Sequence, residues 1–236
     1  MVQVITDDTL LERPRTLRLR FSKVGSLQYI SHLDLMRTMT RALIRARLPL
    51  WYTQGYNPIP HLVFATPLSV GTESRCEFLD VRIVKNVDPD AVLSAVNATL
   101  PQELRILEVY YPEAKFNALV YSEYEIKIVS DAITDGYLSR ASELLWQKPL
   151  TVTKKTKAGI RDVDISGGIR KLELNQDGNS LQIHAVLAAN SAEFLNPELL
   201  IRILKEKTGI LSGDPVQEHY SILRIDDYTE DMARFR

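Results

Sequence analysis

The chain has 236 residues, of which 45% are hydrophobic and 25% charged, and its formal net charge is −1. It holds no run of about 18 apolar residues, so we expect no transmembrane helix. Its one cysteine, Cys76, excludes an internal disulfide and a cysteine-ligated cluster. No basic region followed by an apolar block opens the chain, so we expect a cytoplasmic protein without a secretory signal.

The first half of the chain alternates between strand and helix patterns. Leu17, Leu19 and Phe21 alternate with polar residues, which indicates a strand with one buried face. Apolar residues at helical spacing follow, and Pro49 ends that helix because a residue before proline resists helical geometry. The predicted elements are strand 15–24, helix 31–47, strands 50–54, 61–66 and 76–84, helix 88–100 and strand 104–111.

The second half repeats this order. Pro197 opens its last helix and Gly209 closes it. The predicted elements are strand 121–129, helix 134–147, strands 150–156 and 181–187, helix 197–209 and strand 217–226. Between the middle strands lies an insertion at 157–173, whose glycines and mixed charge predict a flexible hairpin.

Both halves therefore have the order β-α-β-β-α-β. We predict an α+β protein with tandem ferredoxin-like domains and antiparallel sheets. The N-terminal domain covers residues 14–115, and the C-terminal domain, with its Gly/Lys-rich insertion, covers residues 120–228.

Basic residues are concentrated in two segments. Residues 14–61 carry a net charge of +7, so the rest of the chain carries −8. The second basic segment is 148–171. Such asymmetry favours a polyanionic partner, although cations on solvated faces beside acidic neighbours would give the same count. The candidate anion-binding residues are Arg37, Arg41, Arg45, Lys154, Lys155, Lys157 and Arg161.

Ser31, His32 and Asp34 suggest a catalytic triad at first sight. Ser31 and Asp34 instead fit a capping box, in which the serine oxygen accepts a backbone N–H at the start of the helix. A triad needs three converging side chains, and adjacent residues point apart. His32 then lies in the first helical turn. Arg37, Arg41 and Arg45 follow at four-residue spacing, which places them on one helical stripe that is either a phosphate-binding surface or a solvated face.

The loop after this helix reads QGYNPIPH. Gly55 permits a positive φ, and Asn57 precedes a proline. Gln54, Tyr56, Asn57 and His61, together with His32, are candidates for stacking on a base and for hydrogen bonding to it. The alternative is a structural turn in which Tyr56 fills the core and Asn57 bonds its own backbone.

A metal site is not expected. His32 and His61 lack a third histidine or cysteine at zinc spacing. His184 and His219 lie on predicted strands, where core or surface positions are expected. Asp162 and a second acid two residues later could bind Mg²⁺, but pairs of this kind are usually solvated.

The segments SHLDLMR, QGYNP and PLSVG, in this order, resemble an uncharacterised bacterial family of radical-SAM-associated proteins. The resemblance is strongest over residues 15–85 and returns near KAGIRDVDI. One departure is Ile59-Pro60-His61, where the family pattern has His-Pro followed by Lys or Arg. Members occur beside, or fused to the C-terminus of, a radical SAM protein of the cobalamin-binding type. The resemblance therefore implies a radical SAM partner.

Because this chain has only Cys76, the iron–sulfur cluster and S-adenosylmethionine are expected on the partner, and no cofactor is expected here. The first hypothesis is a non-catalytic accessory module that binds tRNA or rRNA and presents it for modification. The second is a metal-independent endoribonuclease-like enzyme that uses His32, an analogy based on fold. The third is a protein–protein adaptor that docks on the radical SAM partner.

Overall fold

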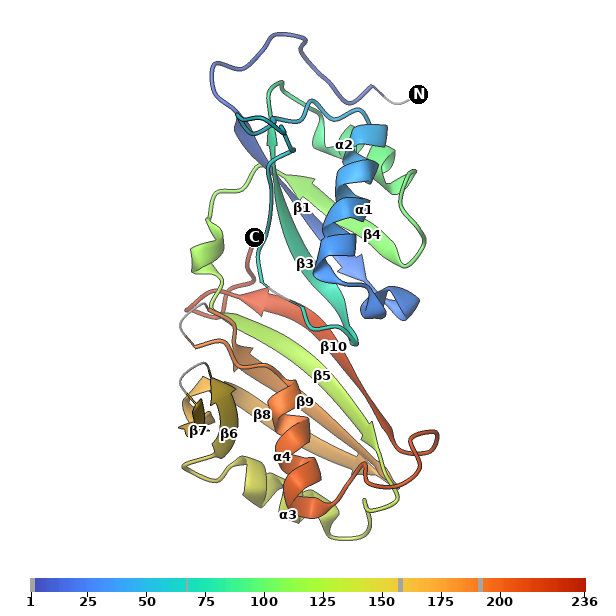
Figure 1. Ribbon diagram of the computed structural model, residues 1–236, viewed down its shortest axis with the longest axis vertical. Helices are drawn as coiled ribbons and strands as arrows, with labels where there is room; N and C mark the ends of the chain where they lie inside the picture. Colours follow the sequence, from blue (N-terminus) through green and yellow to red (C-terminus); the bar gives the residue numbers. More distant parts are fainter. Residues whose placement is uncertain (1–2, 67, 157–158, 191–192) are drawn as a thin grey trace. The chain divides into compact units, whose positions relative to one another are not determined.

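The computed structural model describes residues 3–66, 68–156, 159–190 and 193–236, and the chain divides into two compact units. Unit 1 is Met1–Phe116 with Arg236, and unit 2 is Asn117–Phe235. In each unit, helices cover one face of an antiparallel sheet (Figure 1). The predicted α+β class with antiparallel sheets is confirmed. Among the described residues, no helix is long and apolar enough to cross a membrane.

Unit 1 has the ferredoxin-like order of elements. They are β1 (Arg15–Lys23), the 3₁₀ helix η1 (Gly25–Tyr29), α1 (His32–Arg45), β2 (Leu62–Phe64), β3 (Thr72–Ile83), α2 (Pro89–Asn97) and β4 (Leu104–Tyr110). The strands pair in the order β4-β1-β3-β2, and each pair is antiparallel. Leu17, Leu19 and Phe21 of β1 are fully buried, as their alternation predicted. They form one core with Met39 and Leu43 of α1.

The segment between α1 and β2 differs from its prediction. Residues 50–54 form no named strand, and their pairing is limited to isolated bridges from Leu50 to Ile83 and from Tyr52 to Pro60. Pro60 lacks the N–H that a continuous ladder needs. The segment is therefore the base of a loop.

Unit 2 contains a second ferredoxin-like set with an inserted hairpin. The elements are β5 (Tyr121–Val129), α3 (Tyr137–Leu145), β6 (Thr151–Thr156), β7 (Gly159–Asp164), the 3₁₀ helix η3 (Ser166–Gly168), β8 (Ile169–Asp177), β9 (Ser180–Ala188), α4 (Glu198–Thr208) and β10 (His219–Tyr228). Another 3₁₀ helix, η2 (Phe116–Ala118), precedes β5. The pairings within the unit give the order β10-β5-β9-β8, all antiparallel.

The middle strands of unit 2 correct the prediction. The segment predicted as a sheet strand at 150–156 is β6, which pairs with β7 in a separate two-stranded sheet. Its place in the main sheet belongs to β8, which begins inside the predicted insertion and continues beyond it. Gly178, at φ 57°, forms the tight turn between β8 and β9, because a residue with positive φ is needed there. The Gly-Asn pair at 178–179, which forms the two-residue loop between the paired residues Asp177 and Ser180, was the overlooked hairpin signal.

Candidate functional site

The start of α1 is capped by its own residues. The backbone N–H of Asp34 donates to Ser31 Oγ at 3.1 Å, and the Ser31 hydroxyl donates to the Asp34 carboxylate at 2.7 Å. This hydrogen bond from Ser31 lowers the pKa of Asp34, and Arg37 lowers it further. The capping interpretation is confirmed, and the Ser31 hydroxyl is committed to Asp34. His32 is exposed, with its ring edge-on to Phe64 at 5.0 Å between centroids.

Three cations of β1 are already engaged within unit 1. Arg18 and Arg20 of β1 form ion pairs with Asp80 and Glu108 on the neighbouring strands. Lys23 is buried and donates to backbone carbonyl oxygens at 3.1–3.3 Å. These charges stabilise the sheet of unit 1 and are not available to a polyanion.

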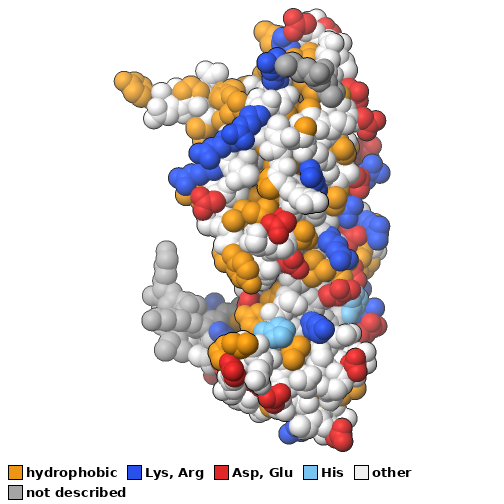
Figure 2. All heavy atoms as spheres, turned by 90° about the vertical axis from the view of Figure 1, so that its right-hand side faces the viewer, with side chains coloured by type: hydrophobic (Ala, Val, Ile, Leu, Met, Phe, Trp, Pro, Cys, Tyr) orange, Lys and Arg blue, Asp and Glu red, His pale blue; other side chains and the backbone are white. Residues whose placement is uncertain are grey.

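Arg37, Arg41 and Arg45 are all exposed along α1. Arg37 lies 3.4 Å from the Asp34 carboxylate, whereas Arg41 and Arg45 form no ion pair with any residue that the structure describes. Figure 2 shows a row of Lys and Arg side chains in the part of the view occupied by unit 1, on the side where α1 lies. The helix therefore presents positive charge that the protein leaves largely uncompensated.

The end of α1 fixes where the stripe stops. Ala46 is the C-cap, and Arg47 adopts the left-handed conformation at φ 59°. The N–H of Leu48 donates to the carbonyl of Leu43 at 3.2 Å, and that of Arg47 donates to Ile44 at 3.0 Å. This is the Schellman arrangement. It ends the helix before Pro49 and directs the chain toward the next loop.

The loop 53–59 is closed at its base by backbone hydrogen bonds. Thr53 N donates to the carbonyl of Ile59 at 2.9 Å, and the N–H of Ile59 donates to Thr53 Oγ1 at 3.2 Å. Gln54, Tyr56 and Asn57 are exposed, and the Tyr56 side chain is fully so. Tyr56 does not fill the core, which contradicts that part of the structural-turn alternative. The exposed aromatic ring and the two amides remain predicted base contacts.

His61 lies at the base of this loop and is half-buried. Its N–H donates to the Trp51 carbonyl at 3.1 Å, and its ring is edge-on to Trp51 at 5.8 Å. Its Nδ1 is enclosed, with no hydrogen-bond partner among the described residues. His61 is thus less accessible than Tyr56, and its surroundings favour support of the loop.

The second basic segment forms part of the hairpin of unit 2. Lys154 on β6 stands opposite Arg161 on β7, and Lys155 is next along β6. Arg161 is exposed. Lys157 lies outside the described residues. The two basic segments therefore belong to different units: α1 is part of unit 1, and this hairpin is part of unit 2.

The two acids of β7 serve the hairpin itself. Asp162 accepts a hydrogen bond from Thr153 Oγ1 at 2.7 Å. Asp164 accepts from the N–H groups of Ser166 at 2.9 Å and Leu150 at 3.0 Å. The bond from Ser166 is the main cause that lowers the pKa of Asp164. Among the described residues, no group of three or more His, Cys, Asp or Glu side chains is placed to hold a metal ion.

A polar network on the sheet of unit 2 was not foreseen. Glu123 of β5 has one oxygen 2.5 Å from His184 Nε2, and its other oxygen accepts the Tyr228 hydroxyl at 2.5 Å. Burial, followed by this carboxylate, raises the pKa of Tyr228 to about 12. Glu173 on β8 lies 3.7 Å from His184 Nδ1. The network links side chains from four adjacent strands, which sequence periodicity alone cannot bring together.

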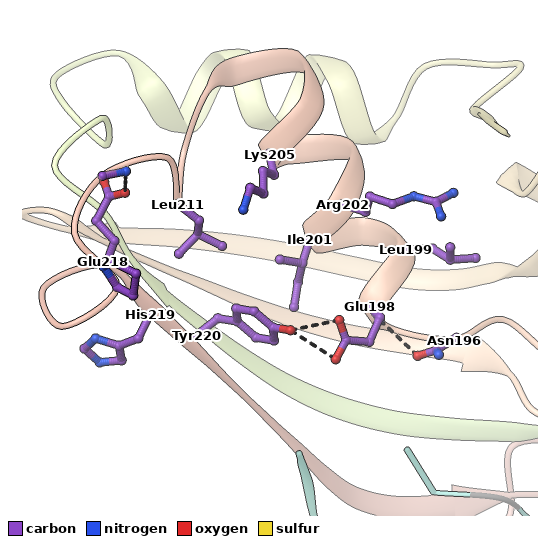
Figure 3. Close-up of a pocket in the computed structure, with 12 residues that line it drawn as sticks. Asn196, Glu198, Leu199, Ile201, Arg202, Lys205, Leu211, Glu218, His219 and Tyr220 are labelled. Atoms are coloured by element: carbon purple, nitrogen blue, oxygen red, sulfur yellow. Dashed lines mark hydrogen bonds between the residues drawn. The ribbon is translucent and has the colours of Figure 1, made fainter. Parts of the chain in front are cut away.

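A pocket of about 680 Å³ lies between α4 and the start of β10 (Figure 3). Glu198 and Lys205 come from α4, and Tyr220 comes from β10. The Tyr220 hydroxyl donates to both Glu198 oxygens, at 3.0 and 3.2 Å. Sequence reasoning assigned α4 and the last strand but not the pocket, because only the folded sheet brings Tyr220 to the helix.

The far wall of this pocket is the segment before β10, which Glu218 holds in place. The Ser130 hydroxyl donates to Glu218 at 2.5 Å, the Asp131 N–H donates at 3.0 Å, and the Gly213 N–H also donates. These bonds, with that from Ser130 first, lower the pKa of Glu218. The N–H of Leu211 donates to Ser130 Oγ at 3.1 Å. The pocket therefore has a fixed frame on both sides.

A family model described as "Uncharacterized protein conserved in bacteria (DUF2344)" matches residues 16–197. The chain belongs to DUF2344. The SHLDLMR, QGYNP and PLSVG segments all lie inside the matched region. No curated protein matches the DUF2344 chain significantly.

Among solved structures, the DUF2344 chain is similar to one in a "Cbf5-Nop10-Gar1 Complex", with 9% identity and a TM-score of 0.49. The match covers 97% of the DUF2344 chain and 59% of the other, so it spans less than two thirds of that protein. An unknown protein from Galdieria sulphuraria gives 10% identity, coverage of 90% and 99%, and a TM-score of 0.26. A putative glycine cleavage system transcriptional repressor gives 12% identity and a TM-score of 0.23. That match covers 90% of the DUF2344 chain and 98% of the other. Likenesses at this level carry no inference about function.

Proposed function

We propose that this DUF2344 protein is a non-catalytic accessory module that binds RNA, either tRNA or rRNA, for a radical SAM modification system. The observation that carries the proposal is the exposed stripe of Arg37, Arg41 and Arg45 on α1, of which Arg41 and Arg45 have no acidic partner among the described residues. Guanidinium groups bind phosphate oxygens in a forked geometry, and a row of them follows a nucleic-acid backbone.

The loop 53–59 supplies the second element of recognition. A fully exposed tyrosine on a loop closed at its base is suited to stacking on an unpaired base. Gln54 and Asn57 flank Tyr56 and carry both donors and acceptors for a base edge. Phosphate contacts on α1 would set the position of the RNA, and the loop would select the nucleotide.

The radical SAM partner follows from the family resemblance and the cysteine count. A radical SAM cluster needs closely spaced cysteines, whereas Cys76 is single and buried. The iron–sulfur cluster and S-adenosylmethionine would therefore belong to the partner protein. The DUF2344 chain would hold the RNA while the partner performs the chemistry.

Binding of total tRNA and of rRNA fragments, measured by fluorescence anisotropy from 50 to 300 mM salt, tests the RNA proposal. The double variant Arg41→Gln/Arg45→Gln removes two exposed cations from α1. Arg75→Gln/Lys115→Gln removes two exposed cations from elsewhere in unit 1 and is the matched control. We expect the α1 variant to reduce the slope of log affinity against log salt by about 0.7–0.9 for each lost phosphate contact, and the control to leave it unchanged.

One outcome would overturn the proposal, and two others would redirect it. Absence of salt-dependent binding to either RNA would overturn it. Nuclease-resistant co-purification with a radical SAM protein, lost in Arg41→Glu, would show that the stripe is a protein-docking surface. RNA cleavage by the wild type that disappears in His32→Ala would show instead that the chain is an endoribonuclease.

A further inference from the structure

The pocket between α4 and β10 contains a cation that the fold does not use. Lys205 forms no ion pair with any residue that the structure describes, and Figure 3 shows its side chain directed into the space beside Ile201, Leu211 and Tyr220. Arg202, one turn earlier, is engaged elsewhere: it donates to the Thr153 carbonyl at 2.9 Å and lies 3.6 Å from Glu206. Lys205 is thus the cation available to an anionic group in the pocket.

The opposite end of the pocket offers an acceptor. Glu198 accepts the Tyr220 hydroxyl with both oxygens, which fixes the carboxylate and the tyrosine ring relative to each other. A carboxylate has about four lone-pair positions, so Glu198 retains capacity for an N–H donor. A second anion would be repelled there. The ligand must therefore present a donor at this end and its negative charge at the other.

Between these two ends the pocket has an apolar stretch, while Glu218 and His219 line its other wall. Ile201, Leu199 and Leu211 line the pocket together with the ring of Tyr220, which is about two-fifths exposed. A volume of about 680 Å³ lies within the range of small-molecule sites. The exposed tyrosine ring is suited to stacking against a flat heterocycle. The ligand would stack a ring on Tyr220, donate a hydrogen bond to Glu198 and place an anionic group on Lys205.

The spacing of the two charged ends restricts the length of the ligand. Glu198 and Lys205 are seven residues apart on α4, which puts them on one face and about 10 Å apart along the axis. A nucleoside monophosphate spans a comparable length from its exocyclic amine to its phosphate. Inorganic phosphate and single amino acids are too short to reach both ends.

The N-terminus of α4 does not supply an alternative phosphate site. Asn196 Oδ1 accepts the N–H of Glu198 at 3.1 Å, and the N–H groups of Leu199 and Leu200 donate to the carbonyls of Asn196 and Pro197 at 3.0 Å. The first amides are therefore already occupied. Attraction of an anion to this pocket depends on Lys205.

We propose that this pocket binds a purine nucleoside monophosphate, free or at the 5′ end of an RNA, with the phosphate on Lys205, the base on Tyr220 and the exocyclic amine on Glu198. The proposal stands independently of RNA binding by α1. A free nucleotide and a 5′ RNA end present the same phosphate, base and amine. They differ only in whether an RNA chain continues beyond the ribose.

Isothermal titration calorimetry of the full chain tests the site with AMP, IMP, adenosine and inorganic phosphate. We expect AMP to bind at least about tenfold more tightly than adenosine, which lacks the anion, and than IMP, whose carbonyl faces Glu198. Phosphate alone should not bind measurably. A 5′-phosphorylated short RNA that binds more tightly than AMP, while its 5′-hydroxyl form does not, would identify an RNA end as the source.

Variants separate the two ends of the site. Lys205→Gln should make AMP and adenosine bind equally, and Glu198→Gln should remove the preference for AMP over IMP. Lys207→Gln, which removes an exposed cation of α4 outside the pocket, is the matched control and should change neither ratio. Circular dichroism verifies the fold of each variant. No AMP binding at millimolar concentration, or an equal loss in Lys207→Gln, would overturn the proposal. Unchanged AMP binding in Arg41→Gln/Arg45→Gln would show that the two sites are separate.

Discussion

Arg18 and Asp80 stand directly opposite each other on β1 and β3 and form a two-point ion pair, with Nε to Oδ1 at 2.7 Å and Nη2 to Oδ2 at 2.8 Å. Arg18 is fully buried, and Asp80 is partly exposed. A buried guanidinium needs its carboxylate because an unpaired charge in this setting is costly. The pair therefore belongs to the framework of unit 1.

Arg18→Leu should destabilise unit 1 by about 3 kcal/mol, because it leaves Asp80 without its partner. Urea unfolding followed by the fluorescence of Trp51 measures this in a Trp146→Phe background, which removes the signal from unit 2. Arg20→Leu breaks a more exposed pair with Glu108 and should cost under about 1 kcal/mol. Equal losses in the two variants would contradict the assignment.

Ser31→Ala should destabilise unit 1 by about 1 kcal/mol through loss of the helix cap. Ser31→Asp should retain most of the stability, because aspartate is also a strong N-cap. Both values come from urea titration. A Ser31→Ala variant with unchanged stability but altered RNA hydrolysis would revive the catalytic interpretation of Ser31, His32 and Asp34.

Arg47→Gly should stabilise unit 1 by about 1 kcal/mol. The left-handed conformation of Arg47 costs a residue with a Cβ more than it costs glycine. Arg45→Gly, at the last residue of α1, should have the opposite sign. Thermal or urea unfolding of the two variants measures both changes in stability. Destabilisation by both substitutions would show that the Arg47 side chain itself stabilises unit 1.

The hydrogen bonds to Glu218 predict a stability contribution that depends on pH. Its folded pKa is lowered, so the contribution is present above the ordinary value of 4.5 and is lost as pH falls through the folded pKa. Glu218→Gln should therefore be less stable than wild type at pH 7, with a difference that shrinks toward pH 3. Urea midpoints of both proteins across this range measure it, with Trp146 as the reporter. A stability difference that does not change with pH would contradict the lowered pKa of Glu218.

The raised pKa of Tyr228 predicts a stability contribution that is lost at high pH rather than at low pH. Burial and Glu123 raise its pKa to about 12, so its contribution is full below pH 10 and is lost as pH rises through 12. Glu123→Gln removes the neighbouring charge and should return the pKa of Tyr228 part of the way toward 10. Difference absorbance of phenolate in Glu123→Gln, compared with Tyr228→Phe to assign the signal, tests this.

The parts of the fold that depend on local chemistry were predictable from the sequence. The helix at α1 followed from Ser31, Asp34 and its apolar spacing, and residues 121–129 were placed as β5 because their alternation is uninterrupted. Pairing partners were harder. The alternation in residues 150–156 is that of a strand, but nothing local distinguishes a strand of the main sheet from one arm of a hairpin.

The candidate sites divide in the same way. The arginine stripe was predictable because its three members share one helix. The pocket was not: Glu198 and Lys205 share α4, but Tyr220 reaches them only after β10 has joined the sheet beside β5. The ion pairs of Arg18 and Arg20 with acids on other strands were also not predictable, because the register between strands determines which residues meet.

The closed base of loop 53–59 has a consequence for affinity. A free segment of this length would lose backbone entropy on ordering around a partner, at about 1–2 kcal/mol for each residue. Here the bonds between Thr53 and Ile59 impose much of that order during folding. Tyr56 is fully exposed on a loop whose base is already closed, so a larger share of its contact energy would appear as binding.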